Sequence, residues 1–163
     1  MTDELPSANR KIMKKTSVLF FLIFICPTIK LYCQNIFPEK FDDCNTDRFA
    51  LESDTTTAKI QDEQLFNILA SFDEKTRKRI RGTLSLQIIV SLDGNSCLIS
   101  LKNDTNIKTK NLNLKQKIDH ELKWNNLHER VAAIIVFRFE ENGTKFKRLG
   151  MNANKGIHEL SNN

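Results

Sequence analysis

Apolar side chains recur at every second position after Gly82, at Leu84, Leu86, Ile88, Val90 and Leu92. This period of two is typical of a strand with one buried face. Asp93-Gly94 follows at once and favours a tight turn, because glycine adopts positive φ without steric cost. Cys97, Ile99 and Leu101 then alternate in the same way. The pattern predicts a β-hairpin over residues 82–101, with Cys97 on the core-facing side.

Two other segments have the spacing of amphipathic helices. Leu65, Ile68, Leu69 and Phe72 lie at i, i+3, i+4 and i+7, which predicts a helix from Asp62 to about Phe72. A second set is spaced by four and predicts a short helix that ends near Trp124, namely Leu114, Ile118 and Leu122.

The segment from Arg130 to Glu140 alternates apolar residues on one face, and its middle is apolar on both faces. This pattern predicts a strand that is covered or that pairs with another chain. Asn142-Gly143 marks a further turn, and Phe146 with Leu149 predicts a short fourth strand. We expect an irregular lead-in over 34–61 and a polar, frayed tail over 151–163.

These elements predict an α+β fold, a small antiparallel sheet (a hairpin plus a closing strand, a β-β-α-β core) with helices packed on one face. The expected domain spans residues 62–150, which suffices for one small core.

The formal net charge of +5 is unevenly placed, since residues 1–33 carry +3 and residues 34–163 only +2. That balance excludes a nucleic-acid-binding face, which needs concentrated positive charge. One basic cluster remains, consisting of Lys75, Arg77, Lys78, Arg79 and Arg81. It is either a solvated helix end, where cations complement the helix dipole, or a docking patch for an acidic partner or lipid head groups.

Residues 13–33 combine Lys14-Lys15 with an apolar stretch over 17–29, which is shorter than the roughly 20 residues that span a bilayer. We interpret residues 1–33 as an export-signal region, with Met13 as a candidate start. Cleavage near Gln34, lipidation at Cys26 or Cys33, and retention as an anchor stay open. We therefore expect a periplasmic or cell-envelope location.

Export places Cys44 and Cys97 in an oxidising compartment, where they form either one disulfide or two unpaired thiols. Cys97 with His120 and Asp119 could supply a thiol nucleophile and a base, but an inward-facing cysteine is a poor nucleophile. The three histidines lack metal-ligand spacing. We expect no enzyme, no cofactor and no metal.

Three segments, taken in order, resemble the TonB C-terminal domain family over about residues 78–140. They are the hairpin KRIRGTLSLQIIVSLDGNSCLISLK, the helix LNLKQKIDHELKW and the closing strand VAAIIVFRF. A proline soon after the tryptophan is missing, and so is the long Pro-rich linker of energy-transducing members. These departures favour a free or lipid-tethered TonB-like module over a full transducer.

The resemblance implies an interaction module that binds an extended peptide, the TonB box of an outer-membrane receptor, beside its last strand by strand addition. It implies contacts at Ile134, Val136 and Arg138 on that strand. A central or capped strand is the alternative, because strands that are apolar on both faces are usually buried. A small secreted inhibitor or immunity-type binder is a second function compatible with this fold. Exposed strand edges are also compatible with a homodimer.

Overall fold

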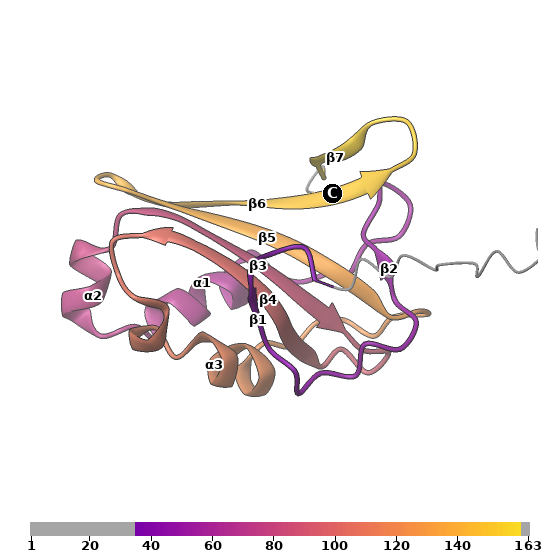
Figure 1. The fold of residues 1–163 in the computed structure, drawn as a ribbon, viewed down its shortest axis with the longest axis horizontal. Helices are drawn as coiled ribbons and strands as arrows, with labels where there is room; N and C mark the ends of the chain where they lie inside the picture. The colour runs from indigo at the N-terminus through magenta and orange to yellow at the C-terminus, as the bar shows by residue number, and fades with distance from the viewer. Residues whose placement is uncertain (1–34, 161–163) are drawn as a thin grey trace, which may run out of the picture. The chain divides into compact units, whose positions relative to one another are not determined.

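The computed structural model describes residues 35–160, which form one seven-stranded sheet with helices on one face (Figure 1). The paired strands are antiparallel except for one parallel pair. This arrangement confirms the predicted α+β fold class. The strands are β1 (Glu39–Lys40), β2 (Ala50–Leu51), β3 (Gly82–Val90), β4 (Ser96–Thr105), β5 (Val131–Glu140), β6 (Gly143–Asn152) and β7 (Gly156–Glu159). The helices are α1 (Asp62–Ala70), α2 (Glu74–Arg79), the 3-10 helix η1 (Thr109–Asn111) and α3 (Leu114–Glu121). The strand order is β1-β4-β3-β5-β6-β7, and β2 pairs with the start of β5.

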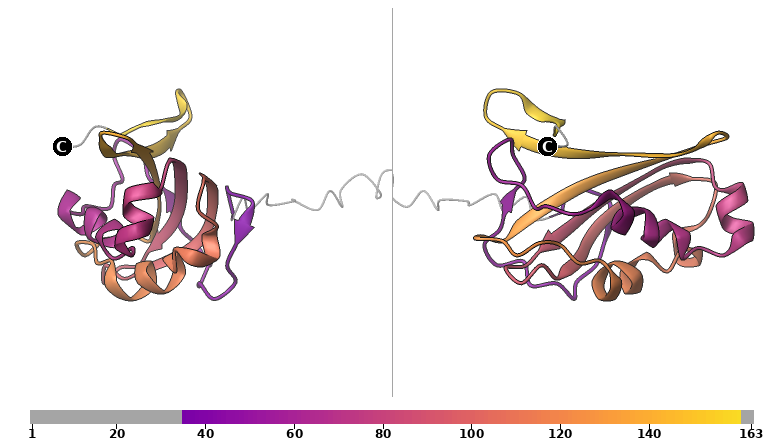
Figure 2. Two further views of the ribbon diagram at one scale, coloured as in Figure 1. Left: turned by 90° about the vertical axis from the view of Figure 1, so that its left-hand side faces the viewer. Right: turned by 180° about the vertical axis from the view of Figure 1, so that it is seen from behind.

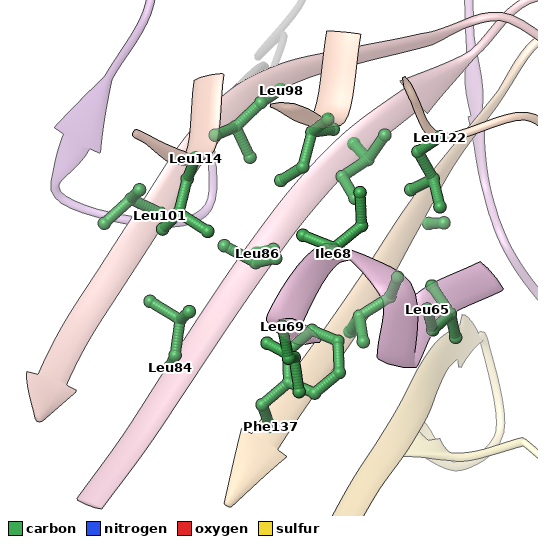
Figure 3. Packing of buried hydrophobic residues seen from close by; sticks show 14 of the residues in the cluster. Leu65, Ile68, Leu69, Leu84, Leu86, Leu98, Leu101, Leu114, Leu122 and Phe137 are labelled. Atoms are coloured by element: carbon green, nitrogen blue, oxygen red, sulfur yellow. The ribbon is translucent and has the colours of Figure 1, made fainter. Parts of the chain in front are cut away.

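The main core lies between the sheet and the layer of α1 and α3. Leu84 and Leu86 of β3 and Phe137 of β5 are almost fully buried there. The close view shows Leu69 of α1 above Phe137, and Leu114 of α3 beside Leu101 of β4 (Figure 3). The helical spacing read from the sequence therefore aims both helices at the same sheet face, as predicted.

A β-bulge in the β3–β4 hairpin changes which residues of β4 face this core. The register shifts between Gln87 and Ile88, so that Ile99 is the extra residue on β4. Leu101 and Leu98 face the helices, whereas Cys97 and Ile99 join a separate apolar cluster on the opposite face. The prediction that Cys97 points into the main core is wrong, because simple alternation does not continue through a bulge.

The turn between β3 and β4 is longer than a two-residue hairpin and depends on Gly94. Its φ is +77°, and a Cβ atom there would lie 2.1 Å from the carbonyl oxygen of Trp124. The Gly94 carbonyl in turn accepts a hydrogen bond of 2.9 Å from the Trp124 N–H. Glycine is therefore required here both by its conformation and by the close approach of the chain that follows α3.

The lead-in segment covers the sheet face that the helices leave open. A disulfide joins Cys44 to Cys97, and Cys44 packs with Ile89 and Ile99. Farther along this face, the Ile36 N–H donates to the buried side chain of Gln87 (2.8 Å). The segment expected to be irregular thus supplies β1, β2 and the residues that cover a second, smaller core.

The C-terminal part of the chain is more regular than its sequence indicates. The short fourth strand expected around Phe146 is the ten-residue strand β6. The tail expected to be frayed contains β7, which pairs with β6 from Leu149 to Asn152. The predicted export signal lies outside the described residues. Within 35–160, no helix combines the length and apolar character needed to cross a bilayer.

Candidate functional site

The three residues predicted to contact a partner lie on β5, in the interior of the sheet. β3 pairs with β5 along one side, and β6 pairs with it along the other from Ile134 to Glu140. Ile134 is buried, Val136 is half-buried and only Arg138 is exposed. The prediction of an available edge at Ile134, Val136 and Arg138 is wrong, because β6 already occupies the place that a partner strand would take.

The open edge of this half of the sheet belongs to β6 instead. β7 covers the outer side of β6 from Leu149 to Asn152, and the Leu160 N–H extends that pairing to the Arg148 carbonyl (2.9 Å). Among residues 35–160, no strand pairs with the outer side of residues 143–147. Figure 1 shows β7 folded back over only one end of β6.

The direction of the backbone groups on this edge follows from the Leu160–Arg148 bond. Arg148 points its backbone groups outward, and in an antiparallel ladder successive residues point to opposite neighbours. Thr144 and Phe146 therefore also direct their N–H and C=O groups outward, whereas Lys145 bonds inward to Arg138 on β5. Thr144 and Phe146 thus present two donors and two acceptors at the spacing that an added strand uses.

An aromatic surface lies beside this edge on the helix side. The Phe146 ring meets the Phe66 ring of α1 edge to face, with centroids 5.3 Å apart, and lies 6.0 Å from the ring of Phe137. Phe66 is 39% exposed, whereas Leu65, Ile68 and Leu69 of the same helix are buried. Side chains of a strand added to β6 would lie next to Phe146 and meet Phe66.

The opposite side of the same edge is charged. Lys145 and Arg138 both pair with Glu140 at 3.0 Å, and Lys147 pairs with Glu159. The hydrogen bond from Lys145 holds the pKa of Glu140 below its usual range. Solvent-exposed pairs of this kind contribute little to stability, and they leave the lysines able to meet another partner.

The inner end of the open edge is fixed by a buried ion pair. Arg148 bonds to the carboxylate of Glu52, which is 0% exposed, and its guanidinium lies 5.4 Å from the centre of the Trp124 ring. The Ala58 N–H also donates to that carboxylate (2.7 Å). Burial is the largest influence on Glu52 and raises its pKa. These contacts hold β6 in place where β7 begins to cover it.

The remaining chemistry of the described residues is structural. Cys97 is oxidised to the disulfide, so it offers no thiolate, and the Lys115 ammonium lies 3.6 Å from both sulfur atoms. His158 donates from Nε2 to the Asp54 carboxylate (2.9 Å), and its Nδ1 lies 3.0 Å from the Gly156 carbonyl. Within 35–160, no group of three or more histidine, cysteine or acidic residues is arranged to hold a metal ion.

The sequence indicates β5 rather than β6 as the open edge because the strand pattern of β6 is weak. On the sheet face opposite Phe146, the strand carries Lys145 and Lys147 before Leu149, so charged residues interrupt its hydrophobic pattern. Lysine on a strand is typical of a sheet edge, and that was the signal available in the sequence.

No protein-family model, curated protein or solved structure matches this chain.

Proposed function

We propose that this chain is a non-enzymatic interaction module that binds an extended peptide by strand addition to the outer edge of β6, over residues 143–147. The open backbone edge beside Phe66 and Phe146 is the observation that carries this proposal. Main-chain hydrogen bonds supply affinity in such complexes, and pockets for alternate side chains supply selectivity. An exposed edge is otherwise a liability, so a protein that retains one has a use for it.

The proposed partner is a protein of the cell envelope. The apolar N-terminal stretch over 17–29 and the Cys44–Cys97 disulfide both support a role outside the cytoplasm. The TonB-like order of hairpin, helix and strand over residues 78–140 favours the peptide of an outer-membrane receptor as the ligand. The proposal transfers the binding edge from β5 to β6.

The test compares two variants at a position whose backbone points outward. Thr144→Pro removes one outward N–H and leaves the β5–β6 ladder intact, since proline is tolerated on edge strands whose N–H faces solvent. Thr144→Ser keeps that N–H and is the matched control. Each form of the purified chain is used to capture proteins from an envelope extract, and the captured proteins are identified by mass spectrometry.

We expect wild type and Thr144→Ser to recover the same receptor, and Thr144→Pro to lose it while keeping its circular dichroism spectrum. Equal recovery by the folded proline variant would show that the β6 edge is not the binding site. Recovery of a protease or toxin by all three forms would favour the inhibitor or immunity-type function.

A further inference from the structure

The positive charge of the described fold is concentrated at one end of the sheet. We call residues 73–81 and 106–111 the basic end. Seven cations and two acids lie within it, a net charge of +5, whereas residues 35–160 as a whole carry +2. The cations are Lys75, Arg77, Lys78, Arg79, Arg81, Lys108 and Lys110. The rest of the described fold is therefore net negative.

The two segments of the basic end are joined by Asn106. Its amide side chain donates to the Arg79 carbonyl (2.9 Å) and accepts from the Arg81 N–H (2.8 Å). α2 buries none of its side chains, and of the seven cations only Lys78 forms an ion pair among the described residues, with Glu74. The Arg81 guanidinium donates to the carbonyls of Lys78 and Ile80, and the Thr109 hydroxyl donates to the Glu39 carboxylate (2.9 Å). The charges of the basic end are thus held together and remain available to a partner.

The sheet register relates the basic end to the open edge of β6. Residues 73–81 lead into β3, two strands from β6, and residues 106–111 follow β4, three strands from β6. Gly82, which follows α2, is opposite Phe139 on β5, and Phe139 is opposite Thr144 on β6. Two strand spacings amount to about 10 Å. Both views in Figure 2 likewise show α2 at the end where the β5–β6 hairpin turns. A strand added along β6, one spacing farther out, therefore leaves the sheet at the same end as α2, about 15 Å from the start of β3.

A second copy of this chain does not suit the β6 edge. Antiparallel pairing of two such edges would bring Lys145 and Lys147 against the same lysines of the other copy. Like charges directly opposite each other are destabilising in a sheet. A lipid surface is also disfavoured, because the exposed large apolar side chains lie outside the basic end, at Phe66, Leu92, Met151 and Ile157.

We propose that the peptide bound by β6 has two parts, an apolar or aromatic side chain that packs against Phe66 and Phe146, and a group of acidic residues that reaches the basic end. This inference rests on the proposed function and specifies its ligand. From Phe146 to Gly143 an extended chain covers about 10 Å, so the acidic residues lie roughly three to six positions from the apolar anchor. At the hairpin, Glu140 is already bonded by Arg138 and Lys145, and the exposed Glu141 is one negative charge set against the net +5 of the basic end.

The test uses a displayed library of random peptides, each about twelve residues long, selected on three forms of the full chain. One form is wild type. The second carries Lys75→Gln, Arg77→Gln and Arg79→Gln in the basic end. The matched control carries Lys40→Gln, Lys59→Gln and Lys123→Gln, which remove the same charge from exposed lysines elsewhere.

We expect wild type and the control to enrich peptides with acidic residues to one side of an apolar anchor, and the basic-end variant to lose that enrichment. The most enriched peptide, once synthesised, should bind wild type about tenfold more tightly than its Glu→Gln analogue, since several exposed charge pairs of modest energy combine. The basic-end variant should bind both peptides alike.

Absence of acidic enrichment, or its persistence in the basic-end variant, would overturn this inference. Binding of peptide-free chain to phosphatidylglycerol vesicles that is lost in the basic-end variant would assign the charges to a lipid surface and would also overturn it. The proposed function has its own test: it is contradicted if the most enriched peptide binds the Thr144→Pro variant as tightly as it binds wild type. If a neutral peptide binds and its binding requires the Thr144 N–H, the preference for acidic residues is contradicted while strand addition to β6 is retained.

Discussion

The rings of Phe66 on α1 and Phe146 on β6 meet edge to face, with their centroids 5.3 Å apart. The contact joins the helix layer to the outer half of the sheet at the point where β6 lacks an outer neighbour among residues 35–160. Phe146 belongs partly to the core through Phe137, whereas Phe66 stays 39% exposed. The pair is therefore both a packing contact and part of the surface that a strand added to β6 would meet.

Phe66→Ser tests this double role. We expect binding of a selected peptide to weaken by about tenfold, because the apolar side chain of the peptide loses its contact with the Phe66 ring. The free energy of unfolding should fall by about 1 kcal/mol, the usual contribution of an aromatic pair. Phe66→Leu, which keeps the apolar area, should bind nearly as wild type. Fluorescence titration and urea denaturation measure the two effects, and unchanged binding by Phe66→Ser would remove Phe66 from the site.

Loss of the Cys44–Cys97 disulfide should lower stability substantially. The bond spans 53 residues, for which the chain-entropy treatment gives about 4 kcal/mol. Urea denaturation with and without a reducing agent measures the effect, and the double variant Cys44→Ser, Cys97→Ser should show the same loss without responding to reductant. A midpoint insensitive to reductant in wild type would show that the lead-in segment is held by its other contacts.

Breaking the ion pair between Glu52 and Arg148 should be more harmful than replacing both partners. Glu52→Ala leaves a buried cation without its carboxylate, which typically costs 3–5 kcal/mol. Adding Arg148→Met to that variant should recover part of the loss, because no charge then remains buried. Thermal unfolding of the two variants gives the comparison. Equal stability of the single and double variants would show that Arg148 finds solvent in the absence of Glu52.

The β6–β7 ribbon should be more stable at pH 5.5 than at pH 8.5. The Gly156 carbonyl and the Asp54 carboxylate both raise the pKa of His158, so the folded state favours the protonated ring. That stability is fully present below the unfolded pKa of about 6.5 and is lost as pH rises through the folded pKa. Asp54, whose pKa is lowered, stays ionised throughout this range.

Amide exchange at Leu160, whose N–H donates to the Arg148 carbonyl (2.9 Å), reports the opening of this ribbon once it is corrected for the intrinsic dependence of exchange on pH. His158→Gln should remove the pH effect. Equal protection of Leu160 at both pH values in wild type would contradict the role assigned to His158.

The sequence predicted the elements whose patterns are local. Period-two spacing at Leu84 to Val90 located β3, and four-residue spacing located α3, because each pattern directly expresses one buried face. The orientation of Cys97 was missed, since the bulge at Ile99 depends on pairing with β3 and leaves no mark in the alternation. Register of this kind is a property of two strands together.

The open edge of the sheet could not be placed from the sequence for a related reason. The middle of β5 is apolar on both faces, which is equally consistent with a covered strand and with one that recruits a partner. β5 is covered because β6 pairs with it, and the charged residues of β6 obscure its strand pattern in the sequence. The lead-in also pairs with β4 and β5, from more than 50 residues away. Such long-range pairings carry no local signature.

Amide hydrogen exchange of the chain with and without a selected peptide tests strand addition most directly. The account predicts that the Thr144 and Phe146 amides become protected on binding, because each gains a partner on the outer edge. The Lys145 amide, which already bonds to β5, should change little. Tight binding with no added protection at Thr144 and Phe146, or with protection confined to another element, would contradict the account.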